Sequence, residues 1–264
     1  MHFVRAVAIR RWPRGAGTAS LLHLPMDTEQ VYQAPRSDLQ VTSEAPPKGE
    51  PPGYIDQALR LRVVGVGLFA CGIITLLSLG HHAKTWLKVR AFSNEQYTAA
   101  LPALQAQSFK IALWSMLLFY LTAIFFGMFL YRASDNTWAF GARKLRFSPG
   151  WTVGWFMIPV ANLFVPYFVL KELWWASGDR VEQPHTSGNI KLWWVFWLVG
   201  ALLELVVAAF KASPDHADFV RGLELTVLVR TIDLFNAWFA WLMLAAIHKR
   251  QRASAWRTIQ AEAS

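Results

Sequence analysis

Residues 155–170 read WFMIPVANLFVPYFVL, an almost wholly apolar stretch that carries Pro159, Asn162 and Pro166. A proline inside a helix removes one backbone hydrogen bond and clashes with the preceding turn, so a straight, unbroken helix is a poor fit here. Counted from residue 149, the segment is nevertheless long enough to cross a membrane. Whether it crosses, or enters and leaves on one side, therefore decides the topology of the whole chain.

Four other segments approach or reach the length of a membrane-spanning helix. Residues 63–80 and 111–131 carry no charge, residues 192–210 carry one charged side chain, and residues 225–247 carry two. A bilayer core of about 30 Å needs about 20 apolar helical residues. The sequence therefore predicts an all-α polytopic membrane protein with four spanning helices, at about 61–80, 111–131, 191–210 and 224–247.

The Lys and Arg residues beside the apolar segments help to choose between the topologies, because cytoplasmic loops carry an excess of these residues. With five crossings, the two sides of the membrane carry 9 and 11 of them near the spans, and with four crossings they carry 14 and 6. The bias favours four crossings with both termini in the cytoplasm. Five spanning helices remain the alternative.

The local chemistry of residues 148–170 agrees with four crossings. Ser148 and Pro149 suit the N-cap and first position of a helix, while the two later prolines free backbone carbonyls one turn earlier. Backbone freed at membrane depth must be buried in protein or line a wet cavity. We therefore predict a re-entrant or interfacial broken helix over residues 149–175, on the cytoplasmic side. Its motif comprises Pro149, Trp151, Trp155, Pro159, Asn162 and Pro166.

Residues 131–177 read YRASDNTWAFGARKLRFSPGWTVGWFMIPVANLFVPYFVLKELWWAS. A Tyr-Arg-Ala with a nearby Asn follows a spanning segment, and an aromatic-Ser-Pro-Gly-Trp, the Pro/Asn/Pro stretch and a Glu-Leu-Trp-x-Ala-Ser come after it. This combination resembles the signature of a bacterial membrane family, domain-of-unknown-function family 4328, over about residues 60–250. The resemblance implies an integral protein of the bacterial inner membrane and no established activity. The matching residues are Arg132, Asn136, Ser148, Pro149, Gly150, Trp151, Trp155, Phe156, Pro159, Asn162, Pro166, Glu172, Leu173, Trp174, Ala176 and Ser177.

The chain divides into three parts by composition. Residues 1–60 are polar and rich in Pro, Gly and Arg, which predicts a disordered N-terminal tail that is dispensable for folding. The composition changes at Met26, so either Met26 is the true start or residues 1–25 form an unfolded leader. Residues 61–250 form the predicted helical membrane domain, and residues 251–264 form a basic cytoplasmic tail.

Patterns for other kinds of function are weak. The net charge of +9 comes from basic residues that flank the apolar runs, which predicts contacts with the lipid bilayer and its anionic lipids rather than with nucleic acid. Residues 65–70, GVGLFA, match a dinucleotide fingerprint but lie inside an uncharged run, where small residues serve helix packing. The seven histidines lack ligand spacing, and no catalytic motif occurs, so we expect no metal, cofactor or catalytic site.

Three charged residues lie inside the apolar segments: Glu204, Arg230 and Asp233. In the four-crossing arrangement, Glu204 and Arg230 both lie about 9 Å below the outer boundary, and Asp233 shares a helix face with Arg230. Such charges usually pair with one another or line a pathway. A neutralising cluster that locks two helices together is favoured, and a site for an ion or polar solute is the alternative.

Asn162, between its two prolines, leaves two interpretations open. Its amide caps a freed carbonyl in a kinked structural helix, or it binds a substrate. For the whole chain we predict a structural, regulatory or interaction component of the inner membrane rather than an enzyme. The alternative is a small transporter or channel for an ion or polar solute.

Overall fold

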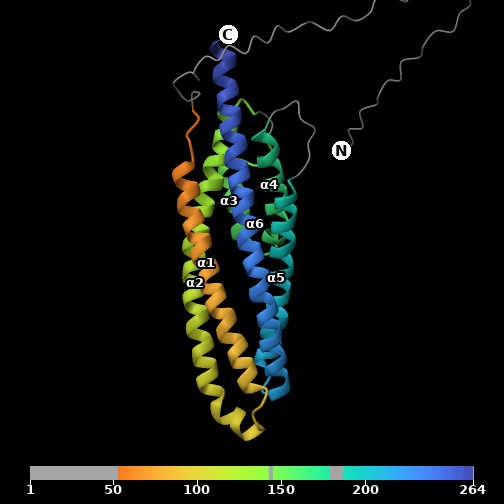
Figure 1. Cartoon of the computed structure of the whole chain (residues 1–264). Helices are drawn as coiled ribbons and strands as arrows, with labels where there is room; N and C mark the ends of the chain where they lie inside the picture. Colours follow the sequence, from red (N-terminus) through yellow and green to blue (C-terminus); the bar gives the residue numbers. More distant parts are fainter. Residues whose placement is uncertain (1–52, 143–144, 179–186, 264) are drawn as a thin grey trace, which may run out of the picture. The chain divides into compact units, whose positions relative to one another are not determined.

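The computed structural model describes residues 53–142, 145–178 and 187–263. These residues form helices and connecting segments and contain no strand, so the all-α prediction is confirmed. Four helices are long and apolar enough to cross a membrane, as predicted. They are α1 (Ala58–Val89), α2 (Asn94–Ala139), α5 (Gly188–Ala212) and α6 (His216–Ala263). Figure 1 shows these helices side by side, with α1 next to α2 and α5 next to α6.

Between α2 and α5 the chain forms a broken helical segment, as the prolines predict. It consists of α3 (Pro149–Gly154), two short 3₁₀ turns, η1 (Trp155–Met157) and η2 (Ala161–Leu163), and α4 (Val165–Ala176). We call residues 149–176 the hairpin. In Figure 1 its two helices lie beside the upper halves of the long helices.

Short turns join the long helices in pairs. Residues 90–93 connect α1 to α2, and residues 213–215 connect α5 to α6. Ser93 and Gln96 form a capping box, in which the Gln96 N–H donates to Ser93 Oγ at 3.3 Å and the Ser93 N–H donates to Gln96 Oε1 at 3.0 Å. This reciprocal bonding satisfies two amides that the first turn of α2 leaves without helical partners.

Both turns lie at the same end of the helical unit, which we call the turn end. A small core of Val89, Tyr97, Phe219 and Leu223 joins α1, α2 and α6 there. The opposite end, where α2 ends and α5 begins, we call the hairpin end. A larger core there combines side chains of α1, α2, α4, α5 and α6, including Phe129, Leu170, Trp193 and Leu244.

The predicted helix bounds are too short. The sequence places loops at 81–110, 132–148 and 211–222, whereas α1 continues to Val89, α2 runs from Asn94 to Ala139, and α6 begins at His216. Hydropathy predicts only the part of each helix that lipid can cover. Packing at the two ends extends the helices beyond those uncharged runs.

The small residues of GVGLFA serve helix packing, as expected. A Cβ added at Gly65 would lie 2.4 Å from Cζ3 of Trp241 on α6, and one at Gly67 would lie 2.8 Å from Oγ1 of Thr122 on α2. Glycine at these positions lets α1 approach both neighbours closely. Gly72, further along the same helix, faces open space.

We predict that Gly65→Ala lowers the stability of the folded protein by about 1–3 kcal/mol, because the rigid Trp241 ring leaves no room for a methyl group. Thermal unfolding in detergent measures the change. Gly72→Ala is the matched control, and it should be neutral or stabilising because alanine favours helix over glycine. Equal unfolding temperatures for the two variants would show that Trp241 does not pack on Gly65.

Candidate functional site

Residues 149–176, the hairpin, start at the end of the helical unit where α2 ends and return to that same end, where α5 begins. On the way in, Val153 of α3 lies so close to Gly127 of α2 that a Cβ there would be 3.1 Å from Val153 Cγ1. Further along, the Phe156 ring lies 5.9 Å from that of Phe126 on α2 and 6.4 Å from that of Trp193 on α5. The chain then turns and α4 runs back. The segment therefore packs between α2 and α5.

The prolines mark the ends of the helical pieces. Pro149 is at the first position of α3 after the N-cap Ser148, as predicted, although the Ser148 side chain makes no capping bond. Pro159 lies in the break between η1 and η2, and Pro166 lies in the first turn of α4. Of the remaining motif residues, Trp151 packs against Trp155, with ring centroids 5.0 Å apart.

The capping interpretation of Asn162 gains no support, since no hydrogen bond joins its side-chain amide to another described residue. Its backbone N–H donates to the Ile158 carbonyl at 2.7 Å, while its side-chain Oδ1 is buried without a partner among the described residues. The Leu163 carbonyl instead accepts a bond of 3.0 Å from Nε1 of Trp194 on α5. A side chain distant in sequence therefore donates to a backbone carbonyl at the helix break. In a low-dielectric surrounding such a carbonyl needs a partner within the protein.

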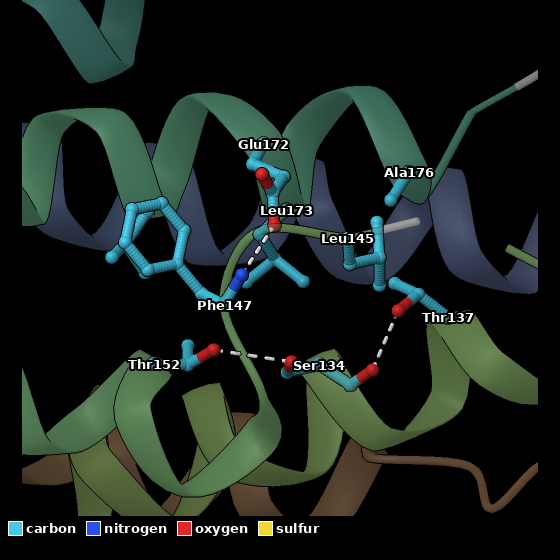
Figure 2. A pocket seen from close by; sticks show the side chains of 9 residues that line it. Ser134, Thr137, Leu145, Phe147, Thr152, Glu172, Leu173 and Ala176 are labelled. Atoms are coloured by element: carbon cyan, nitrogen blue, oxygen red, sulfur yellow. Dashed lines mark hydrogen bonds between the residues drawn. The ribbon is translucent and has the colours of Figure 1, made fainter. Parts of the chain in front are cut away.

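A small polar cavity lies where α2, α3 and α4 meet (Figure 2). Its volume of about 10 Å³ is close to the space that one water molecule needs. Thr152 Oγ1 lies 3.1 Å from Ser134 Oγ, and Glu172 on α4 accepts a bond of 3.1 Å from the Phe147 N–H. Thr137 adds a third hydroxyl to the lining. Glu172 thus fixes the loop that leads into α3.

A buried hydrogen-bonded network at the hairpin end joins four parts of the chain. We call Asn136, Gln251, Gln57 and Ser177 the amide hub. Nε2 of Gln251, on α6, donates to the Ala133 carbonyl at 2.7 Å and to Ser177 Oγ at 3.0 Å. Its Oε1 accepts from Asn136 Nδ2 at 3.2 Å and lies 3.1 Å from the side-chain amide of Gln57. Each of these polar groups is buried and bonded, which is the condition for a stabilising network.

The segment that precedes α1 takes part in this network. The Ile55 N–H donates to Asn136 Oδ1 at 3.1 Å, and Asn136 Nδ2 donates to the Ile55 carbonyl at 2.9 Å. Tyr54 is buried against Phe140. Residues 53–60 therefore belong to the folded domain, and the predicted tail over 1–60 extends too far. Residues 1–52, with the proposed start at Met26, lie outside the described part of the chain.

The predicted C-terminal tail also needs correction. Residues 251–263 continue α6, and Ser254 donates to the Ser177 carbonyl at 3.0 Å. Sequence reasoning missed Gln251 because it follows a run of basic residues. The spacing of Ala240, Leu244, Ile247 and Gln251, all buried, is the signal that continues the inner face of the helix through that run.

The structure brings Glu204, Arg230 and Asp233 together. Arg230 pairs with Glu204 across α5 and α6 through Nη2, and its Nη1 lies 2.6 Å from Asp233 Oδ2 on the same helix. Gly200 faces Asp233, since a Cβ there would lie 3.8 Å from Asp233 Oδ1. We call these three charged residues the charged triad. It lies toward the turn end, whereas the hairpin lies at the hairpin end, so the two predicted features form separate sites.

Comparison with known families adds one finding. The family described as "Domain of unknown function (DUF4328)" matches residues 95–249, more than half of the chain. The chain belongs to this family. The match includes the hairpin, the charged triad, and Asn136 and Ser177 of the amide hub, and it leaves out α1. The comparisons find no match among curated proteins or solved structures.

The DUF4328 residues of the sequence signature have structural roles that the geometry explains. Asn136 and Ser177 belong to the amide hub, and Glu172 holds the entry to the hairpin. The Trp174 ring lies 4.4 Å from the Arg250 guanidinium, which closes α4 onto α6. A Cβ at Gly178 would lie 1.7 Å from that guanidinium, so glycine is required beside it.

We predict that a chain beginning at Pro51 melts like the full chain, whereas one beginning at Leu59 loses about 3–5 kcal/mol of stability. The shorter chain leaves Asn136 Oδ1 without its donor, the Ile55 N–H, and a buried unsatisfied polar group costs about 1–3 kcal/mol. It also removes the buried side chains of Tyr54 and Gln57. Detergent melting of the two chains provides the measurement. If both chains melt together, the hub does not depend on residues 53–58.

We predict that Arg230→Gln lowers the free energy of unfolding by about 3 kcal/mol, which is more than Glu204→Gln lowers it. Losing the guanidinium leaves two carboxylates without their partner. This value is at the lower end for buried pairs, since the triad side chains are 27–42% exposed. The double variant should recover part of the loss. Losses that simply add in this double-mutant cycle would show that the two residues do not interact.

Proposed function

We propose that this protein is a non-enzymatic structural, regulatory or interaction component of the bacterial inner membrane, with the hairpin re-entering the bilayer from the cytoplasmic side. The observation that carries the proposal is the apolar tip of the hairpin. Met157 is 79% exposed and Val160 is 73% exposed. In water this tip would be costly, whereas lipid would cover it without requiring a further protein.

The path of the hairpin supports the re-entrant topology. α2 ends and α5 begins at the same end of the helical unit, so the segment between them has no net crossing to make. The Lys and Arg distribution independently favours four crossings with the hairpin end in the cytoplasm. Basic side chains at that end, Lys171, Lys191 and Lys249, are exposed and suit contact with anionic lipid headgroups.

The absence of a catalytic motif in the sequence motivates the non-enzymatic assignment. The signature residues whose contacts are described above fix backbone, pack helices or close the amide hub, and these are roles of a scaffold. A protein that holds a rigid hairpin in one leaflet offers a shaped surface to a membrane partner. Interaction or regulation is the function that this arrangement supports best.

Thiol labelling in intact cells tests the topology. We predict that Ser187→Cys, in a chain with Cys71 replaced by serine, reacts with a membrane-impermeant maleimide only after the inner membrane is opened. The matched site is Ala91→Cys in the turn between α1 and α2, which should react from the outside. Labelling of Ser187→Cys from the outside contradicts the four-crossing arrangement.

A small transporter or channel is the second candidate. It is favoured by a broken helix together with charged side chains in the spans, a combination that transporters use to bind ions and solutes. Flux of ions and small solutes through liposomes that contain the purified protein separates the candidates. Flux above that of protein-free liposomes, lost in Arg230→Gln, would support the second candidate over the first.

A further inference from the structure

The helices α4 and α5 lie side by side and run in opposite directions at the hairpin end (Figure 1). The Tyr167 ring of α4 lies 5.2 Å from the Trp194 ring of α5, which fixes the register of the two helices. Along this boundary the structure presents an exposed surface that we call the seam. It comprises Phe164, Phe168 and Lys171 on the α4 side and Lys191 and Val195 on the α5 side.

The two lysines of the seam lie at the same depth. Lys171 follows Tyr167 by four residues, and Lys191 precedes Trp194 by three, so each lysine shares a helix face with one ring of the contact. Because the helices are antiparallel, both lysines lie about one turn from that contact, toward the hairpin end. The residue before each lysine is fully buried in one shared core, which agrees with a common depth.

The ammonium groups of these lysines have no anionic partner among the described residues. Both side chains are exposed, and neither forms an ion pair with any of those residues. Glu172 follows Lys171 in the chain, but it lines the polar cavity on another face of α4 and accepts from the Phe147 N–H. The hairpin-end part of the seam is therefore positively charged, and its complement is an anion.

The rest of the seam is apolar and continues toward the hairpin tip. Phe164, Phe168 and Lys171 follow one another at spacings of four and three residues, as on one face of a helix. The two phenylalanines are 54% and 49% exposed, and Val195 lies one turn from Lys191 on the same face of α5.

The length of the seam matches one leaflet of a bilayer. The seven residues from Phe164 to Lys171 span about 10 Å of helix, and one leaflet contributes about 15 Å of hydrocarbon. A surface with a charged end and an apolar body of this length fits a single lipid molecule of one leaflet.

We propose that the seam binds one phospholipid with an anionic headgroup in the cytoplasmic leaflet, an assignment that rests on the proposed position of the hairpin. Lys171 and Lys191 bind the headgroup phosphate, and an acyl chain covers Phe164, Phe168 and Val195. Basic side chains at a membrane surface attract anionic lipids, and the apolar contact adds affinity that a free phosphate ion lacks. The bound lipid joins α4 to α5 from the outside, so it stabilises the broken helix beside its spanning neighbour.

Thermal unfolding of the full chain in a neutral detergent tests the site. Added phosphatidylglycerol should raise the midpoint saturably, by about 5 °C at high occupancy, whereas phosphatidylcholine should not. The double variant Lys171→Gln, Lys191→Gln should weaken the apparent affinity for phosphatidylglycerol at least about tenfold, and Lys171→Arg, Lys191→Arg should keep it. The matched control is Lys249→Gln, Arg252→Gln, which removes two exposed charges of α6 at the same end and should leave the affinity unchanged.

Three results would overturn the site. The first is an equal midpoint in the two lipids, and the second is an unchanged affinity in the glutamine variant of the seam. The third is equal weakening by the seam variant and the α6 control, because the attraction would then be spread over the basic end. A rise of the midpoint with glycerol phosphate alone would overturn the assignment to a lipid.

The unfolding measurement does not depend on the orientation of the protein in a membrane. Loss of the lipid site would therefore leave the labelling result for Ser187→Cys unchanged. A contradicted topology would place the lipid in the other leaflet without removing its selectivity, so the two failures are distinguishable.

Discussion

The backbone groups that a membrane cannot hydrogen-bond are the constraint on which this structure depends. Long helices satisfy most of them internally, and the proline-broken hairpin does not. Its break is therefore placed against α5, where the Trp194 indole donates to the Leu163 carbonyl. The rings of Phe126, Phe156 and Trp193 surround the same region. The position of the hairpin between α2 and α5 follows from this need for partners.

The amide hub secures the hairpin at its other end. Gln251 reaches three segments at once, and its donors and acceptors are all used. Because a partly satisfied polar network is worse than an apolar core, such an arrangement specifies one packing of the segments around it. Asn136 and Ser177 of the DUF4328 signature lie in this hub, and Glu172 lies at the hairpin entry. These residues of the family pattern thus attach the two ends of the broken helix to the rest of the helical unit.

The charged triad pairs charged side chains within the apolar helices, away from the hairpin. It lies in the half of the helical unit away from the hairpin, where α5 and α6 pack around Gly200. Pairing Arg230 with two acids removes most of the cost of burying charge. Lys211 of α5 interacts electrostatically with Glu204 and Arg230 as well, so the formal charges of the four side chains balance.

The sequence by itself determined the four spanning helices, the break at the prolines and the grouping of Glu204, Arg230 and Asp233. These features depend on hydropathy, on proline geometry and on depth along a helix, which are local properties. Only the tertiary structure decided that the Trp194 indole bonds to the Leu163 carbonyl at the break and that Gln251 is buried. It also decided that residues 53–57 belong to the fold. The Gln57–Gln251 contact joins residues 194 apart, and the Ile55–Asn136 pair joins residues 81 apart. A polar residue in a charged or Pro-rich stretch has the same local pattern whether it is exposed or buried, because only a distant partner can satisfy it.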